Sequence, residues 1–481
     1  MRKLKSQKVP FGEKVGYSLG DVAANLIFQV MMIFQLKFYT DVFGLEGAVA
    51  GSVFLIACLS GAFVDPLVGI LCDRTRTRWG KYRPWLLWTA LPLCVFYVLA
   101  FYNPGIEDKG LVALYATVSY ILLIIMYAMS SIPYSSLGGV ITGDIKERTS
   151  VNAVRFIAVS IAVFVVQGLT LPLVNKFGGA AGRVQQGWTM TVALYAVVAF
   201  IFLVISFLST RERIQPPPTQ RVSLKKDVRS TFGSQPWRVI FVLVLFIFLT
   251  ISMWGASMNY YFQYNLDQKS LFDFLTMIGL TDAAAPSDAY SIGFSLFNML
   301  SAVVQLLGIL FLSEHLANKY GKKPTFIVCL SLTALFTGLF YLASPVDIGL
   351  VYGLCVLKSL AYAPTVPLLW AMIGDVADHV EYMRRRRATG FCFSGISFAL
   401  KAGLGLGGAL AGIILSCFGY ESGQHTVQSP SAMEGIRLVS SIVPAILFGI
   451  GAIVMLRYPI SKAYNEKMQA ILAARRRNAE S

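Results

Sequence analysis

Apolar stretches of about 20 residues recur along the whole chain, and each is long enough to cross a bilayer as one helix. Only 14% of the 481 residues are charged, against about 25% in an ordinary soluble domain. The first stretch lacks a small-residue cleavage site, so we expect a retained helix and not a signal peptide. The pattern predicts an all-α membrane protein with twelve transmembrane helices, near residues 16–40, 46–72, 85–102, 110–135, 152–175, 188–209, 237–265, 289–313, 324–343, 348–374, 388–417 and 434–457.

The positive charges predict which way these spans run through the membrane. Lys and Arg gather in the two tails and in the loops after even-numbered spans, whereas the remaining loops hold only Lys109, Lys176, Arg183 and Lys269. Because cytoplasmic loops carry the excess of Lys and Arg, we expect a protein of the cytoplasmic (inner) membrane with both termini in the cytoplasm. The net charge of +16 then needs no nucleic-acid partner.

The two halves of the chain repeat each other. The sequence "RTRWGKYRP" follows span 2 and "LANKYGKKP" follows span 8, and spans 4 and 10 end in "GDIKER" and "GDVADHVEY". Two six-helix halves are the layout of the major facilitator transporters, in which the substrate sits between the halves near the midplane. We expect an N-terminal bundle over 1–209, a linker over 210–236, a C-terminal bundle over 237–457 and a basic cytoplasmic tail over 458–481.

Two further features bound the function. The loop at 266–288 is the only long outer loop; its sequence suggests a short amphipathic helix near the membrane surface, and a lid and a passive insertion both stay open. The seven cysteines include no CxxC pair and predict neither a disulfide framework nor a metal site. We expect no cofactor other than a coupling ion.

Polar side chains inside lipid must find a partner or line a cavity, so they are the candidate functional residues. Asp21, Asn25 and Gln29 recur at every fourth position and therefore share one face of span 1. Three such groups suit a cavity that binds hydroxyls, although hydrogen bonds between helices would also explain them.

Asp65 is the only acid at its depth in span 2, and Lys401 lies about four turns inside span 11. We predict that they form an ion pair. Burial and a neighbouring cation act in opposite directions on a carboxyl group, so Asp65 can be poised to take up a proton or another cation. A purely structural salt bridge is the alternative.

Other polar residues extend the candidate substrate site. Arg155 opens span 5, and Lys358 lies about 15 Å inside span 10 at 1.5 Å per residue. Arginine can hold carboxylates or vicinal hydroxyls, but both side chains could instead extend to the membrane surface. Tyr127 shares a face of span 4 with two serines, and Pro133 can interrupt that helix. The predicted substrate set is Asp21, Asn25, Gln29, Tyr127, Ser131, Ser135, Arg155, Lys358, Tyr362, Trp370, Ser397 and Lys401.

The chain resembles the glycoside–pentoside–hexuronide:cation symporters, the subfamily of the melibiose and glucuronide carriers. The resemblance covers most of the chain, from residue 16 to about 412. It implies that a sugar binds between two helical bundles and is driven by Na+, Li+ or H+. The matching segments are "GYSLGDVAANL", "KFYTDVFGL", "DPLVGILCDRTRTRWGKYRPW", "SSIPYSSL", "NAVRF", "WAMIGDVADHVEY" and "LKAGLGLGGALAG".

The sequence departs from the melibiose carrier type at residues that match that type's cation site and sugar site. That type has two acids four residues apart on span 2 and a third on span 4, near the span 11 lysine. The matching positions here are Gly61, Asp65 and Ser131, so two of the three acids are missing. A sugar-binding acid on span 1 matches Asn25, and a sugar-stacking tryptophan on span 4 matches Ser135.

The missing acids bear on both ligands. Unpaired buried cations are costly, so an acidic sugar could offset Arg155, Lys358 or Lys401; a neutral glycoside stays equally open. A single Asp beside a Lys suits a proton, whereas Na+ would need further oxygens from Ser130, Ser131 or the backbone. We therefore expect H+ rather than Na+ as the coupling ion.

The cytoplasmic face carries another set of charges. Salt bridges across the two halves there would hold the outward-open state and would break when the carrier opens inward. A purely topological role for the arginines is the alternative, and Asp144 could instead pair with Arg155. The predicted gate consists of Asp73, Arg74, Arg78, Asp144, Asp375, Asp378, Glu381 and Arg387.

These features favour a secondary transporter that takes a sugar across the bilayer by alternating access, and the resemblance implies a monomer. A lysolipid or other organic-solute carrier of the same subfamily is the alternative. We do not expect an enzyme, because the sequence offers no nucleophile–base pair and no second acid near Asp65. The half-chain repeat and the charges at membrane depth argue against a channel.

Overall fold

The computed structural model describes residues 8–142, 145–178, 183–213, 232–280, 289–384, 389–422, 427–468 and 470–471. These residues form helices and no β-strand. Twelve of the helical passes are long and apolar enough to cross a membrane. The predicted all-α fold with twelve transmembrane helices is confirmed, and the protein is a multi-pass membrane protein.

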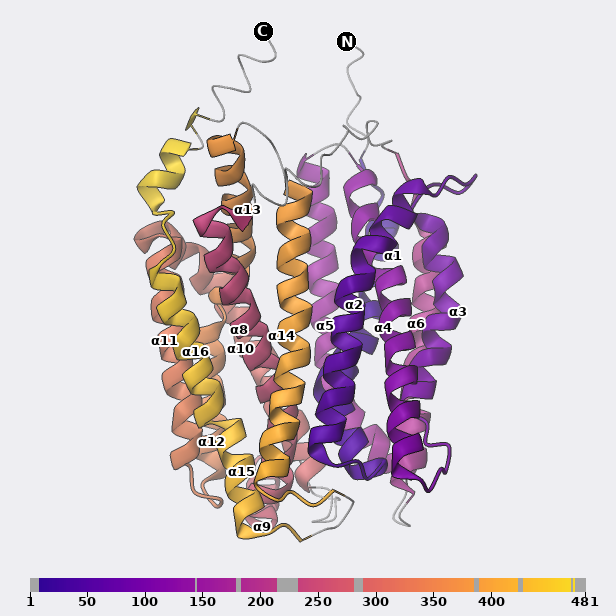
Figure 1. Ribbon diagram of the computed structural model, residues 1–481, viewed down its shortest axis with the longest axis vertical. Coiled ribbons are helices and arrows are strands. Elements are labelled where there is room, and N and C mark those ends of the chain that lie inside the picture. Colours follow the sequence, from indigo (N-terminus) through magenta and orange to yellow (C-terminus); the bar gives the residue numbers. More distant parts are fainter. Residues whose placement is uncertain are drawn as a thin grey trace.

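Six passes from the first half of the chain pack into one bundle, coloured indigo to magenta in Figure 1. The first pass ends in a π-helix over Phe38–Val42, a widened helical turn that often marks a functional site. The helices are α1 (Phe11–Lys37), α2 (Gly47–Arg74), α3 (Arg83–Ala100), α4 (Lys109–Val140), α5 (Ile145–Gly178) and α6 (Val184–Ser209).

The second half of the chain forms a second bundle beside the first. Its first pass also ends in a π-helix, over Tyr261–Asn265. Two of its passes are interrupted where the sequence predicted single helices. The helices are α8 (Gln235–Tyr260), α10 (Ala289–Tyr320), α11 (Lys322–Leu339, with a 3-10 turn over Phe340–Leu342), α12 (Ile348–Tyr362), α13 (Thr365–Arg384), α14 (Thr389–Cys417), α15 (Pro430–Ser440) and α16 (Ile442–Leu456).

The outer loop holds the short amphipathic helix that the sequence suggested, α9 (Gln268–Met277). Its apolar face buries Leu271 and Leu275. The Asp267 carboxylate caps its first turn, and the hydrogen bonds from Ser270 hold the pKa of Asp267 below its usual range. Residues 281–288 of this loop and 214–231 of the linker lie outside the described residues.

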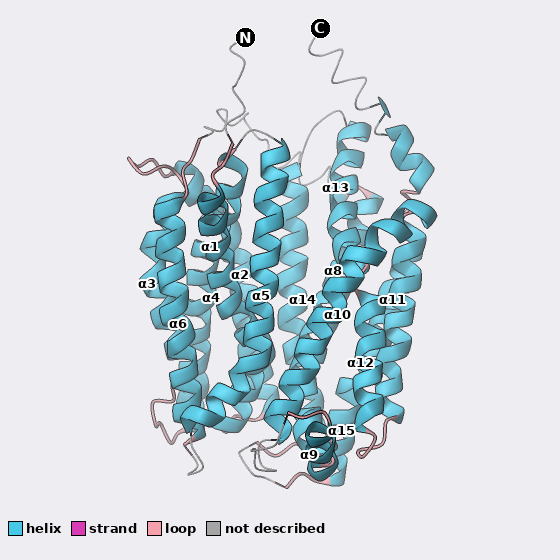
Figure 2. Cartoon of the chain, turned by 180° about the vertical axis from the view of Figure 1, so that it is seen from behind, coloured by secondary structure: helices cyan, strands magenta, loops and turns pink. Residues whose placement is uncertain are grey.

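The helix α1 begins, and α16 ends, at the same end of the molecule, at the top of Figure 1 and of the reverse view in Figure 2. We call this end the inner end, because the Lys- and Arg-rich loops predict that it is cytoplasmic, and we call the opposite end the outer end.

Glycines on α14 bring the two bundles into backbone contact near the outer end. A Cβ atom added at Gly412 would lie 2.1 Å from the carbonyl oxygen of Gly47 on α2. On another face of α14, a Cβ atom at Gly407 would lie 2.2 Å from the carbonyl oxygen of Leu249 on α8. Small residues allow such close approach of helices. One helix therefore packs tightly against its own bundle and against the other bundle.

These two glycines make a matched pair for mutation. Gly407→Val overpacks a contact within one bundle, and we expect a loss of about 1–3 kcal/mol in stability and a lower melting temperature of the purified protein. Gly412→Val overpacks a contact between bundles that must part when the outer side opens. We expect a shift toward the outward-open state with a smaller fall in melting temperature. Equal falls would show that the contact between α2 and α14 is permanent.

Candidate substrate and cation site

The predicted pair of Asp65 and Lys401 is confirmed. The Lys401 ammonium group forms an ion pair with the Asp65 carboxylate, and the two side chains are 22% and 19% exposed. Asp65 lies on α2 and Lys401 on α14, so this pair joins the two bundles. Gly61 faces the same lysine, because a Cβ atom there would lie 3.7 Å from Lys401 Nζ. The position of the missing acid is therefore part of this site.

The two serines proposed as cation ligands, Ser130 and Ser131, lie on α4. Ser130 is buried and Ser131 is half-buried. Among the described residues, no hydrogen bond links either hydroxyl to the Asp65 carboxylate. Their role as ligands of a coupling ion stays a prediction.

The polar face of α1 meets α5 through a second ion pair. Arg155 Nε lies 2.5 Å from Asp21 Oδ2, within the N-terminal bundle. Asn25 Nδ2 donates to the Asp21 carbonyl oxygen at 2.9 Å. Asp144, the other partner considered for Arg155, lies outside the described residues. The charge of Arg155 is thus balanced inside the protein.

Tyr127 connects these two pairs. Its ring stacks on Phe28 of α1 with centroids 5.9 Å apart. Its hydroxyl lies within the range of electrostatic interaction with Asp21, Asp65 and Arg155. The structure therefore gathers Asp21, Asn25, Tyr127, Arg155, Asp65 and Lys401 into one polar region, with Gln29 half-buried one turn outward of Asn25 on α1.

Three other residues of the predicted substrate set are exposed and not part of these ion pairs. Ser135 and Ser397 are exposed, and Trp370 is 47% exposed. Within the described part of the chain, no hydrogen bond connects any of the three to the polar region. The helical pattern placed them on plausible faces but could not show how far those faces extend along each helix.

Lys358 is deeply buried in the C-terminal bundle, with 8% of the residue exposed. Its ammonium group lies 3.4 Å from the centre of the Trp254 ring and 5.8 Å from the centre of the Tyr362 ring. Next to it, Ser301 and Ser359 share a hydrogen bond of 2.7 Å. The alternative in which Lys358 extends to the membrane surface is wrong for this conformation, because the side chain is buried.

The predicted gate at the inner end is only partly visible. Asp375 pairs with Lys322 at 2.6 Å, inside the C-terminal bundle; its predicted bridge across the halves in the outward-open state stays a prediction. Arg74 and Arg78 are exposed, and Asp378 is half-buried with a partner. The described structure does not include the side chains of Asp73, Asp144, Glu381 and Arg387.

The sequence analysis missed a buried polar cluster at the outer end, which we call the outer cluster. Lys37 and Asp41 form an ion pair of 3.1 Å at the end of α1. Tyr420 donates to Asp41 at 2.8 Å, and Lys37 donates to Gln263. Thr40 and Tyr260 share a hydrogen bond of 2.8 Å. The outer cluster consists of Lys37, Thr40, Asp41, Tyr260, Gln263 and Tyr420.

The outer cluster joins the bundles, because its first three members belong to the N-terminal bundle and the other three to the C-terminal half. Burial and the Asp41 carboxylate raise the pKa of Tyr420, so its hydroxyl keeps the proton that it donates. A signal was present in the sequence: "KFYTD" places Lys37 and Asp41 four residues apart at a span end.

Hydrogen bonds and ion pairs between described residues of the two bundles all lie at the Asp65–Lys401 pair or farther outward. Besides the outer cluster, Ser422 donates to the Leu45 carbonyl at 2.7 Å, and Asn175 donates to Ser291 at 2.9 Å. The conformation is therefore closed at the outer end. This agrees with the within-bundle pairing of Asp375 at the inner end.

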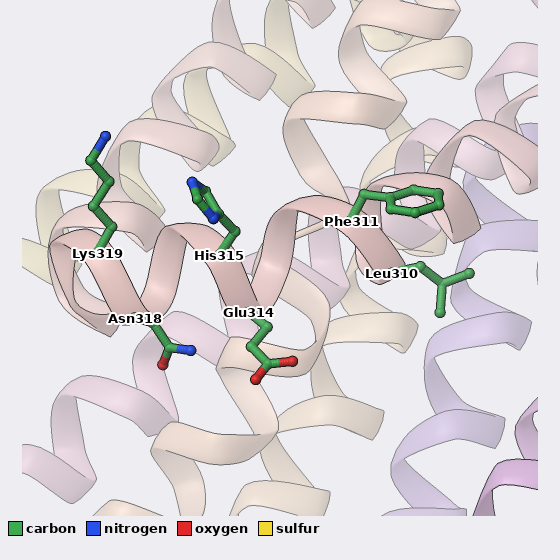
Figure 3. Close-up of a pocket in the computed structure, with 6 residues that line it drawn as sticks. All are labelled: Leu310, Phe311, Glu314, His315, Asn318 and Lys319. Carbon is green, nitrogen blue, oxygen red and sulfur yellow. The ribbon is translucent and has the colours of Figure 1, made fainter.

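A surface hollow on α10 is not a second candidate site. Its lining side chains, labelled in Figure 3, all project from one helix, and they include Glu314, His315 and Lys319. A substrate there would be held from one side only, and none of the predicted site residues takes part.

Loss of one hydroxyl should loosen the outer closure. Tyr420→Phe leaves the buried Asp41 carboxylate short of a donor, which costs about 1–3 kcal/mol in the closed state only. With Cys417→Ser and Ala409→Cys as a reporter at the contact with Gly51, we expect faster labelling by an impermeant maleimide. Tyr115→Phe is the control, since the Tyr115 hydroxyl bonds within one bundle. Unchanged labelling in Tyr420→Phe would show that the outer cluster does not hold the closure.

Comparison with known proteins agrees with this architecture. The family described as "MFS/sugar transport protein" matches residues 16–462. The inner membrane symporter YicJ of Escherichia coli (strain K12) is 33% identical over 98% of this chain and 97% of its own. The isoprimeverose transporter of Lactiplantibacillus pentosus is 31% identical over 94% of this chain and 90% of its own.

A solved structure shows the same fold. The nucleoside transporter NupG superposes with a TM-score of 0.61 over 93% of this chain and 100% of its own, at 15% identity. That identity supports a shared fold and nothing finer. The chain is a membrane transporter and belongs to the sugar transport family of the major facilitator superfamily.

Proposed function

We propose that the protein is a secondary active transporter that moves a sugar together with a proton. The observation that carries this proposal is the ion pair of Asp65 and Lys401, which joins the bundles at membrane depth. The names of two relatives, a symporter and an isoprimeverose transporter, support the same class of function.

The pair couples ion binding to movement through competition for one carboxylate. A proton on Asp65 removes the charge that holds Lys401, so the link between α2 and α14 weakens. A lysine left unpaired at this depth costs about 2.5–3.5 kcal/mol on insertion scales. The protonated state is therefore unfavourable unless substrate or a change of conformation compensates, which links the two ligands.

The surroundings of Asp65 favour a proton over Na+. The nearest other carboxylate of the predicted site, Asp21, is engaged by Arg155. The first position of the acid pair is Gly61, and neither described serine bonds Asp65. A proton needs one carboxylate oxygen, whereas Na+ needs a set of oxygen ligands that these residues do not present in this conformation.

Polar groups of the N-terminal bundle suit a sugar. Asn25, Gln29 and Tyr127 offer donors and acceptors for hydroxyl groups, and Phe28 beside Tyr127 offers an aromatic face for the apolar side of a sugar ring. The positive inner loops support an orientation with both termini in the cytoplasm.

Uptake into proteoliposomes tests the function. We would supply labelled xylosides, glucosides and glucuronides with an imposed H+ gradient or, separately, an imposed Na+ gradient. We expect accumulation of at least one sugar under the H+ gradient and none above equilibration under the Na+ gradient alone. Accumulation driven by Na+ would contradict the proton, and the absence of any sugar transport would contradict the function.

Removal of the carboxyl charge tests the coupling. Asp65→Asn should abolish accumulation above equilibration while it leaves sugar exchange between the two sides measurable, because only the ion site is lost. It should also destabilise the protein by about 3–5 kcal/mol, since Lys401 loses its partner. The double variant Asp65→Asn/Lys401→Gln should regain most of the melting temperature without regaining accumulation. Proton-driven accumulation by Asp65→Asn would place the coupling ion elsewhere.

A further inference from the structure

Two hydrogen-bond donors meet in the C-terminal bundle without an acceptor. The Lys358 ammonium group lies over the ring of Trp254. The indole nitrogen of Trp254 is itself buried and has no hydrogen-bond partner among the described residues. A lysine ammonium and an indole N–H can only donate. The two donors could share one hydrogen-bond acceptor, and a negatively charged acceptor would also balance the lysine.

Three other buried cations of the transmembrane region each have a carboxylate partner, which Lys358 lacks. Lys37 pairs with Asp41, Arg155 pairs with Asp21, and Lys401 pairs with Asp65. Within the described part of the chain, Lys358 Nζ forms no ion pair with a carboxylate and no hydrogen bond. A cation–π contact compensates only part of the cost of burying a charge, so Lys358 is the one member of this group whose charge is not balanced.

The depth of this pair fits a substrate that also meets the N-terminal bundle. The Trp254 ring packs against Phe297 of α10 and Phe340, in an apolar core that continues to Phe34 of α1. Lys358 lies about 15 Å from the outer end of α12, and Gln29 lies about 20 Å from the outer end of the first pass, at 1.5 Å per residue. The depths differ by about the length of a sugar ring.

Span 10 is also interrupted about one helical turn after Lys358. The helix α12 ends at Tyr362, and α13 begins at Thr365 after Pro364. Interrupted helices at the membrane midplane commonly border the substrate site of transporters, where they leave backbone groups free to bind ligand.

We propose that Lys358 and Trp254 form an anchor for the negative charge of the substrate, which is therefore an acidic sugar carrying a carboxylate or a comparable oxyanion. The inference rests on the proposed transport function and deepens it. In the absence of substrate, the ammonium group lies on the indole ring. When substrate binds, its oxyanion accepts hydrogen bonds from Lys358 and from the Trp254 indole, while its hydroxyls meet the polar face of α1.

Paired ligands test the anchor. Binding of 4-nitrophenyl β-D-glucuronide and of 4-nitrophenyl β-D-glucoside, and of D-glucuronate, D-galacturonate and their neutral parent sugars, would be measured by calorimetry on the purified protein. We expect each acid to bind more tightly than its neutral counterpart. Lys358→Gln should weaken binding of the acids about 10- to 150-fold, the loss expected for a hydrogen bond to a charged group, and Lys358→Arg should retain part of it.

Controls separate the anchor from a structural role. Lys269→Gln removes one positive charge from an exposed position on α9 and should leave all affinities unchanged. Lys358→Met should raise the melting temperature of the protein without ligand, because it removes an unbalanced buried charge. Two results together would contradict the anchor: a lower melting temperature in Lys358→Met, and an unchanged affinity for the acids in Lys358→Gln. They would mean that the lysine only supports the packing of Trp254.

The outcomes distinguish this inference from the proposed function. If the neutral sugars bind as tightly as the acids and Lys358→Gln changes neither, the inference fails while sugar transport stands. If none of these sugars is bound or transported, the proposed function fails and the anchor fails with it.

Discussion

A charge inside a bilayer needs a partner, and the ion pair of Asp65 and Lys401 meets that need across the interface between two bundles. Each charge alone would cost several kcal/mol in this environment. Because the partners belong to different bundles, the requirement for pairing becomes a requirement on conformation: whatever neutralises Asp65 also loosens the contact between α2 and α14. In the proposed mechanism, ion binding and movement of the bundles are therefore linked through this one carboxylate.

The other polar contacts are arranged around this pair along the membrane. Outward of it, the outer cluster and the glycine contact of Gly412 with Gly47 close the interface. Inward of it, Asp375 pairs with Lys322 in its own bundle, so that the bundles are not tied there by any bond between described residues. The polar face of α1 and the buried Lys358 lie between these zones, where a substrate would contact both bundles at once.

Much of this fold could be predicted from the sequence, because apolar length and the Lys/Arg bias report directly on the bilayer. The pair of Asp65 and Lys401 could also be predicted, since each charge lies several turns inside an apolar span and needs a partner there. The sequence carried a signal for the Lys37–Asp41 part of the outer cluster, but it gave no reason to join Tyr420 to Asp41, because a tyrosine at a span end needs no charged partner. Fourfold spacing placed Ser135 and Ser397 on polar faces; both are exposed in this conformation, and their contact with substrate stays a prediction. The breaks at Pro364 and Ser441 depend on tertiary packing that tolerates interrupted helices in some places and not in others.

The most direct test of coupling at Asp65 is a distance measurement between the inner ends of the bundles. Spin labels at Leu71 of α2 and Phe311 of α10, both exposed, would be placed in a Cys417→Ser background and followed by pulsed electron paramagnetic resonance as the pH is lowered. We expect the distance distribution to shift as Asp65 takes up a proton, and we expect Asp65→Asn to show one distribution at every pH. A pH response that survives in Asp65→Asn would contradict coupling through this carboxylate.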